Sequence, residues 1–242
     1  MDYNINNFSA LKFRENSKYL IIGPPKSGKT TLLKDIMKIN IDGYNSDCTY
    51  IGKSLDKKSD LAYNVNEPHQ KIILLGKPEK YEKTIKTETI KTLVHDYNTL
   101  IAYDDVLFPF KWTETSFMKG LINYGVLRKT GGIICTEYIP EIPSHLKINI
   151  DYILISGMFD QKDLEIIYNE YAGIVPSFDD FCLLYNSLSD YDFLIVDNTA
   201  YPFNFYKYRT KDKEIIIQPR KESIQIDEND ILSGKMNIGI SI

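Results

Sequence analysis

An eight-residue stretch near the start of the chain combines residue types that suit the binding of a phosphate chain. Gly23-Pro24-Pro25-Lys26-Ser27-Gly28-Lys29-Thr30 matches the Walker A pattern G-x-x-x-x-G-K-S/T at every specified position. In such a loop the backbone N–H groups surround an anionic phosphate, and glycine allows its close approach. We expect Lys29 to bridge the β- and γ-phosphates of ATP and the hydroxyl of Thr30 to ligate Mg²⁺. The residues expected to bind the nucleotide are Gly23, Pro24, Pro25, Lys26, Ser27, Gly28, Lys29, Thr30 and Thr31.

The residues on either side of this stretch predict the local structure that the pattern requires. Tyr19–Ile22 is a short apolar run typical of a buried strand, and Lys29–Lys38 has helical spacing. A strand before the loop and a helix after it argue against a chance match in a lysine-rich chain. The helix would also direct the positive end of its dipole at the phosphates.

A pair of acids follows a second apolar run. Leu100–Tyr103 is followed directly by Asp104 and Asp105. We expect Asp104 to hold Mg²⁺ through water, and Asp105 to orient and deprotonate the water that attacks the phosphate. The alternative is a strand that ends in a turn with two solvated aspartates. A strand and a helix inserted between the two motifs favour the P-loop ATPases that use an acidic base over kinases and GTPases, and the sequence has no guanine-reading N/T-K-x-D motif.

Along the rest of the chain, short apolar runs alternate with stretches of helical spacing. This alternation is typical of an α/β domain with a mostly parallel central sheet flanked by helices. Asp160 and Ser177 stand where the N-caps of two helices are expected. Phe203–Tyr208 has alternating aromatic residues and is expected as an amphipathic edge strand that packs on the core. The other expected strands are Lys18–Ile22, Cys48–Ile51, Lys71–Leu75, Thr99–Tyr103, Gly132–Thr136, Tyr152–Ser156 and Phe193–Val196, and the other expected helices are Glu79–Tyr97 and Glu114–Leu127.

The composition is that of an ordinary folded protein and excludes several classes. Of the 242 residues, 43% are hydrophobic and 26% are charged, which excludes a wholly disordered or fibrous chain. The length predicts one domain over residues 1–210 and a C-terminal extension, residues 211–242, whose fold the sequence does not predict. A net charge of −4 argues against a wholly basic nucleic-acid coat. Three cysteines without a CxxC spacing exclude a disulfide scaffold and fit a reducing compartment.

Several segments together resemble the genome-packaging ATPases of poxviruses and related large DNA viruses, within the FtsK–HerA superfamily. The resemblance extends from about Leu20 to Tyr208 and rests on the order and spacing of its blocks. These blocks are Gly23–Thr30, Leu100–Asp105, Asn123–Lys129, Ile133–Tyr138, Ile142-Pro143, Lys147–Asn149 and Tyr152–Leu154. The resemblance implies a RecA-like P-loop ATPase core that assembles into a homo-oligomeric ring and drives double-stranded DNA into a capsid, with a capsid vertex protein as a further partner.

Three positions depart from the family pattern, and each affects an expected role. The family ends the strand after the paired acids with a glutamine that senses the γ-phosphate, whereas here Glu137 or Thr136 would have to serve. Lys147 stands where the family has an arginine ahead of Asn149, and lysine cannot make the bidentate contact. The arginine-containing turn before the sensor strand is shifted in register, which leaves Arg128 as the best arginine finger for a neighbouring subunit. Arg128 at a solvated helix end is an equally good interpretation.

Two other functions stay open on the sequence alone. A P-loop kinase for a small molecule or nucleotide would need several arginines in its lid, and the whole chain has four. A nucleotide-binding structural subunit without hydrolysis would explain the missing sensor glutamine. The chain lacks the marks of a signal peptide and of a membrane span, so we expect a soluble protein in the host cytoplasm or the virion. Trp112 is expected either as a core anchor or as a subunit contact.

Overall fold

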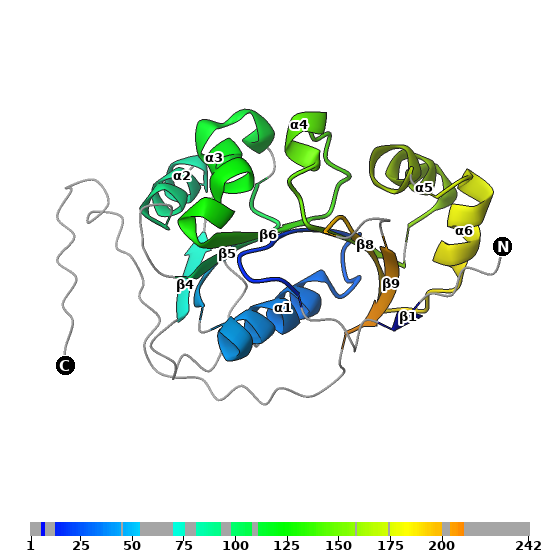
Figure 1. The fold of residues 1–242 in the computed structure, drawn as a ribbon, viewed down its shortest axis with the longest axis horizontal. Coiled ribbons are helices and arrows are strands. Elements are labelled where there is room, and N and C mark those ends of the chain that lie inside the picture. Colours follow the sequence, from blue (N-terminus) through cyan, green and yellow to red (C-terminus); the bar gives the residue numbers. More distant parts are fainter. Residues whose placement is uncertain are drawn as a thin grey trace.

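The computed structural model describes residues 6–7, 13–44, 46–53, 70–75, 81–92, 98–107, 111–157, 159–173, 175–199 and 204–210. The expected extension, residues 211–242, lies outside the described residues, as does Phe203. Within the described residues, nine strands form a single sheet in the order β1-β9-β8-β7-β2-β6-β5-β3-β4, with helices on both of its faces (Figure 1). No helix in this part of the chain has the length and the apolar composition needed to cross a membrane.

The elements follow one another in the alternating order that the sequence predicts. The strands are β1 (Asn6–Asn7), β2 (Lys18–Ile22), β3 (Asp47–Lys53), β4 (Gln70–Leu75), β5 (Thr99–Asp104), β6 (Thr130–Thr136), β7 (Tyr152–Ser156), β8 (Asp192–Asp197) and β9 (Asn204–Arg209). The helices are α1 (Lys29–Tyr44), α2 (Tyr81–Thr92), α3 (Ser116–Tyr124), α4 (Ser144–Lys147), α5 (Gln161–Ile167) and α6 (Phe178–Asn186). Short 3₁₀ turns cover Trp112–Glu114 and Val126–Arg128, and a π-helical turn covers Tyr168–Ala172.

Six neighbouring strands, from β7 through β2, β6, β5 and β3 to β4, run parallel. Strand β8 is antiparallel to both β7 and β9. The predicted mostly parallel α/β sheet is therefore confirmed. Because the six strands are parallel, their carboxyl ends share one edge of the sheet, called the carboxyl edge below, and their first residues share the opposite amino edge. Ile22 pairs with Thr136 and Asp104 pairs with Cys135, which brings the ends of β2, β6 and β5 to the same level.

Two hydrophobic clusters fill the space between the sheet and its helices. Helix α1 covers one face of the sheet, and α2 to α6 lie over the other face (Figure 1). One cluster includes Leu33 of α1 and is called the α1-side cluster below. Along β2, Tyr19 and Ile21 belong to the α1-side cluster, whereas Leu20 and Ile22 belong to the cluster on the opposite face. Alternate side chains of a strand point to opposite faces. A strand covered on both faces must therefore be apolar throughout, as Tyr19–Ile22 is.

The structure confirms the predicted N-caps and changes the ends of two predicted helices. The side chains of Asp160 and Ser177 accept hydrogen bonds from backbone N–H groups at 2.9 and 3.1 Å. Helix α1 continues to Tyr44, and the side chain of the buried Asn40 within it donates to the carbonyl of Ile36 at 2.9 Å. Helix α3 ends at Tyr124, before the predicted Leu127.

The chain leaves α3 at Gly125. The chain continues there as a 3₁₀ turn over Val126–Arg128, and Lys129 takes a left-handed conformation with φ 51° before β6 begins.

The prediction that Phe203–Tyr208 is an edge strand is wrong in one respect. Strand β1 pairs with β9, so β9 lies one strand in from the edge within the described sheet.

The packing of α1 leads to a stability prediction. Leu33 of α1 is fully buried under the sheet, and Leu183 of α6 is 69% exposed. We expect Leu33→Ala to lower the free energy of unfolding by about 2–5 kcal/mol, because it removes buried methyl groups and leaves a cavity. The matched helical change Leu183→Ala should alter it by less than about 0.5 kcal/mol. Urea unfolding followed by circular dichroism measures both values, and equal losses would contradict this packing.

Candidate functional site

The loop between β2 and α1 turns sharply and lies against both neighbouring strands. Lys26 and Gly28 have positive φ angles of 65° and 89°. The N–H of Gly23 donates to the carbonyl of Thr136 at the end of β6, at 3.2 Å. A β-carbon on Gly23 would lie 2.8 Å from Cβ of Ser156 in β7, so this position has no room for a side chain. The loop thus leaves the sheet between β6 and β7 at the carboxyl edge.

The first turn of α1 presents backbone N–H groups to this loop. The N–H of Leu32 donates to the carbonyl of Gly28 at 2.9 Å, which is the first backbone bond of the helix. The N–H groups of the preceding residues, Lys29 and Thr30 among them, have no carbonyl to bond within the helix. With the positive end of the helix dipole, these groups form a site suited to a phosphate anion.

The two predicted motifs meet at one carboxylate. The hydroxyl of Thr30 donates to Oδ2 of Asp104 at 2.9 Å, although the two residues are 74 positions apart. The hydroxyl of Tyr50 in β3 donates to the same oxygen at 2.8 Å. The other oxygen, Oδ1 of Asp104, is buried and has no hydrogen-bond partner among the described residues. A carboxylate oxygen and a hydroxyl oxygen side by side are ligands that Mg²⁺ prefers, so the residues present fit this ion.

The second acid lies beside the lysine of the loop. Nζ of Lys29 is 3.6 Å from Oδ2 of Asp105, and it also donates to the carbonyl of Pro24 at 3.1 Å. Asp105 takes a left-handed conformation with φ 54°, and its N–H donates to the carbonyl of Cys135 at 3.2 Å. Burial, and then the carboxylates of Asp104 and Asp105, raise the pKa of the Cys135 thiol well above its usual value. The thiol therefore stays neutral.

Comparisons with known proteins bear on the fold that carries this site. No protein-family model matches the chain. The uncharacterized protein 075L of Invertebrate iridescent virus 6 is 26% identical to it, over 76% of this chain and 71% of that protein. The genome-packaging NTPase B204 of Sulfolobus turreted icosahedral virus 2, solved with ATPγS, superposes with a TM-score of 0.61 and 15% identity, over 82% of this chain and all of that one.

A second solved structure is similar to the same extent. B204 of Sulfolobus turreted icosahedral virus, described as a DNA-packaging ATPase, has a TM-score of 0.58 and 16% identity, over 81% of this chain and 99% of that one. The chain has the fold of these viral P-loop ATPases. The comparison confirms the expected fold class and agrees with the family resemblance noted in the sequence.

Glu137 lies at the end of β6, between two anchored residues. The hydroxyl of Thr136 donates to the carbonyl of Tyr138 at 3.0 Å, and Nε1 of Trp112 donates to the hydroxyl of Tyr138 at 2.9 Å. Burial raises the pKa of Tyr138. Trp112 is itself buried in the core, which decides between its two interpretations in favour of a core anchor. The exposed side chain of Glu137 is thus carried on a fixed backbone next to the phosphate loop.

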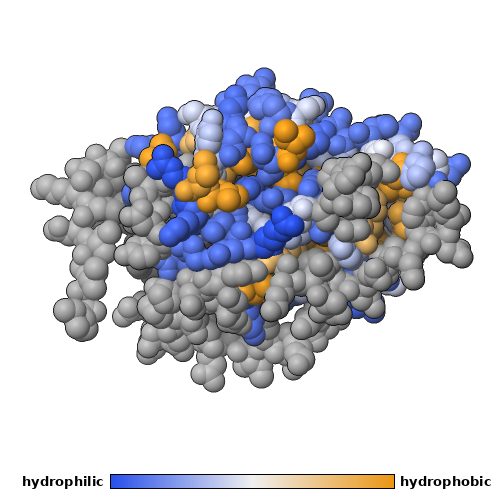
Figure 2. Space-filling view, viewed as in Figure 1, coloured by the Kyte–Doolittle hydropathy of each residue, from blue (hydrophilic) through white to orange (hydrophobic). Residues whose placement is uncertain are grey.

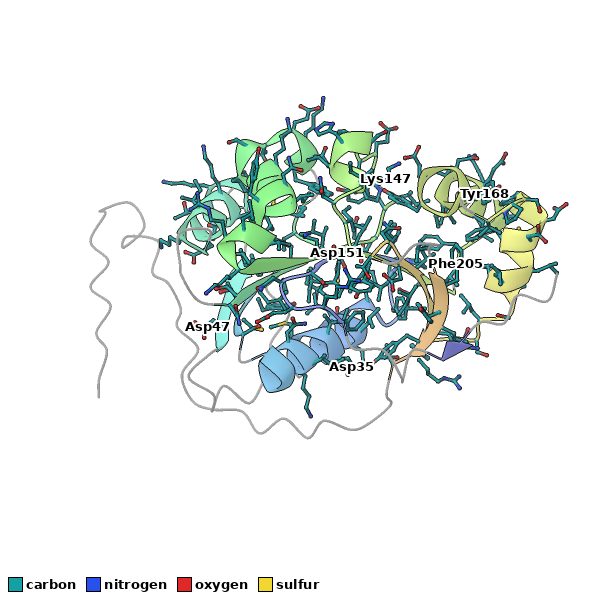
Figure 3. The ribbon with its side chains drawn as sticks, viewed as in Figure 1. Asp35, Asp47, Lys147, Asp151, Tyr168 and Phe205 are labelled. Carbon is teal, nitrogen blue, oxygen red and sulfur yellow. The ribbon has the colours of Figure 1, made fainter. Side chains whose placement is uncertain are left out.

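Three residues of the family pattern lie away from this site. Arg128 is exposed and precedes β6. Lys147 contacts the carboxylate of Glu170 at 2.6 Å, and it lies on the opposite side of the sheet from Asp35 of α1 (Figure 3). Asn149 donates to the side chain of Asn123 at 3.1 Å. The strand β6 between Arg128 and the phosphate loop spans roughly 20 Å at about 3.3 Å per residue. The structure does not bring these residues to the paired acids.

Tyr50 contacts the site but was not predicted from the sequence. It reaches Asp104 by lying over Gly52, its neighbour two residues along β3. A β-carbon on Gly52 would lie 2.4 Å from the hydroxyl oxygen of Tyr50 and 2.5 Å from Cε1. Gly52 also pairs with Asp104 across the sheet. A glycine two residues after a tyrosine in a buried strand is the only sequence signal for this contact.

This close approach can be tested through stability. We expect Gly52→Ala to lower the free energy of unfolding by about 1–3 kcal/mol, because the added methyl group displaces the ring of Tyr50. In a Tyr50→Ala background the same change should cost less than about 0.5 kcal/mol, because the ring is gone. Chemical denaturation of the four proteins of this double-mutant cycle gives the coupling. Equal costs in both backgrounds would show that the ring does not lie over Gly52.

Proposed function

We propose that this chain is a Mg²⁺-dependent ATPase that moves double-stranded DNA and packages a viral genome into a capsid. The observation that carries the proposal is the 2.9 Å contact between Thr30 and Asp104. It joins the end of the phosphate loop to the end of a buried strand two positions away in the sheet. Phosphoryl-transfer sites of this class require that pairing of a hydroxyl and a carboxylate.

The nucleotide would be held mainly by the backbone of residues 23–30. The N–H groups of the loop and of the first turn of α1 bind the phosphates, and Lys29 places its charge between the β- and γ-phosphates. Nζ of Lys29 lies 3.6 Å from Oδ2 of Asp105, so the charge of the lysine lies on the side of the loop that faces the paired acids. Thr30 and Asp104 would hold Mg²⁺, which when bound neutralises charge on the phosphates.

Asp105 is the residue we assign to the activation of water. As the oxygen of the water bonds to the γ-phosphorus, the bond from that phosphorus to the β–γ bridging oxygen breaks and ADP leaves. Asp105 accepts the proton that the water loses. Its side chain is 15% exposed, so water reaches it while the surrounding protein limits other contacts. Glu137, at the end of the neighbouring strand β6, is the residue we assign to sensing the γ-phosphate.

Assembly of several copies would complete the site. Arg128 is separated from its own phosphate loop by the length of β6, so an arginine finger at this position must act on another copy. Apolar side chains are exposed beside it and on the adjoining end of α4, among them Leu127 at 82% and Ile148 at 78%. In Figure 2, hydrophobic residues reach the surface over α3 and α4. This surface supports contact between copies in a head-to-tail ring.

The proposal also includes the movement of DNA. It is supported by the order of the sequence blocks and by the fold shared with B204, which is described as a DNA-packaging ATPase. The expected partners are double-stranded DNA, further copies of this chain and a capsid vertex protein, and the expected locations are the host cytoplasm and the virion.

Two substitutions test the hydrolytic site. We expect Lys29→Ala and Asp105→Asn each to lower phosphate release from ATP by about 100-fold or more, because one removes a phosphate contact and the other the base. Asp105→Asn should still bind ATP. Double-stranded DNA should raise the rate of the parent protein. A phosphate-release assay with and without DNA, together with an ATP-binding measurement, gives these values.

Matched changes away from the site provide the controls. Lys83→Ala on α2 and Asp179→Asn on α6 alter exposed residues and should leave the rate unchanged. Undiminished turnover in Asp105→Asn would remove it from the role of base. Phosphate transfer to a nucleotide, with no response to DNA, would indicate a kinase. Tight ATP binding without any release would indicate a nucleotide-binding structural subunit.

Mixing two inactive proteins tests whether Arg128 acts between copies. Arg128→Ala retains an intact phosphate loop, and Lys29→Ala retains an intact arginine. Equal amounts of the two should recover about a quarter of the parent rate, because random mixing in a head-to-tail ring pairs an intact loop with an intact arginine at one interface in four. Phosphate release measured before and after mixing gives the answer. A mixture no more active than its two components would rule out a finger supplied by a neighbour.

A further inference from the structure

One side of the phosphate loop is covered by a half-exposed aromatic ring. A β-carbon placed on Gly28 would lie 3.2 Å from Cδ1 of Tyr191, 3.8 Å from Cε2 of Phe193 and 3.9 Å from Oγ1 of Thr210. Phe193 is fully buried, whereas 48% of Tyr191 is exposed. The ring of Tyr191 therefore borders the loop and still faces solvent.

The backbone that carries this ring is firmly held. Tyr191 occupies the turn before β8 with φ 65°, and its carbonyl accepts from both the N–H and the hydroxyl of Thr210 at 3.4 Å. The next residue, Asp192, is fully buried, and its carboxylate contacts Nζ of Lys207 at 2.7 Å and Nε of Arg209 at 3.4 Å. These ion pairs join the start of β8 to the end of β9, so the position of Tyr191 is fixed relative to the sheet.

The strand order places this ring on the side of the loop opposite to the paired acids. Asp104 and Asp105 follow β5, which lies beyond β6 when counted from β2. Tyr191 precedes β8, which lies beyond β7 on the other side of β2. A triphosphate bound along the loop with its γ-phosphate at the acids would extend past Gly28 toward β8. Its ribose and base would then lie on the side of Tyr191.

We propose that the base of the bound nucleotide stacks on the ring of Tyr191. This inference rests on the proposed function, and it names the residue of that site that takes the base. An aromatic face stacks with every nucleobase, because each base has its own aromatic face. The contact would therefore add affinity for nucleotides over inorganic polyphosphate and would discriminate little among bases.

The test compares ATP with a ligand that has phosphates but no base. Dissociation constants for ATP and for inorganic tripolyphosphate, each with Mg²⁺, are measured by calorimetry on the full chain and its variants. We expect Tyr191→Ala to weaken ATP binding by about tenfold or more and to leave tripolyphosphate binding unchanged. Tyr191→Phe retains the ring and should bind ATP as the parent does.

The matched control and the contrary outcomes separate this inference from the proposed function. Leu183→Ala removes a 69% exposed apolar side chain of α6 and should change neither constant. Position 191 has φ 65°, so alanine and phenylalanine meet the same backbone strain there, and thermal unfolding shows whether either variant is destabilised. Unchanged ATP affinity in Tyr191→Ala, equal losses for both ligands, or a loss in Tyr191→Phe as large as in Tyr191→Ala would overturn the stacking role. A parent protein that binds neither ligand would instead overturn the proposed function.

Discussion

The contact between Thr30 and Asp104 depends on the register of three parallel strands. Asp104 can meet Thr30 only because β5, β6 and β2 end at the same level, and because its side chain points to the face that carries α1. Along β5, Leu100 and Ala102 belong to the α1-side cluster, so Asp104, two positions further, faces the same way. A slip of one residue would send the carboxylate to the other face of the sheet. The apolar pattern of these strands therefore positions the chemistry as well as stabilising the fold.

The sequence was informative wherever a local pattern decides the structure. The phosphate loop, the strand before it and the helix after it are specified by neighbouring residues, and the paired acids directly follow an apolar run. Strands between 18 and 22 and between 152 and 156 were predicted to the residue. Parallel strands joined by helices meet at one edge by geometry, so the meeting of Thr30 and Asp104 could be expected from the order of elements alone.

Contacts between strands that are distant in the sequence could not be predicted from local patterns. Tyr50 lies in β3 and touches the site only because β3 pairs with β5, a pairing that no local pattern encodes. Strand β8 was predicted, but nothing in its residues indicates that it runs antiparallel and so begins, rather than ends, at the phosphate loop. Because β8 runs antiparallel to β7, Tyr191, which precedes β8, lies at the edge of the sheet that carries the phosphate loop. The two-residue strand β1 is too short to have a pattern of its own, and it moves β9 from the edge of the described sheet.

The length of β6 has a consequence for when the protein can work. The phosphate loop and Arg128 lie at its two ends, so one chain cannot bring both to the same nucleotide. If a neighbour supplies the arginine, a solitary subunit would hold ATP without consuming it, and its specific activity would climb with protein concentration. Hydrolysis would then require a local protein concentration high enough for subunits to contact one another.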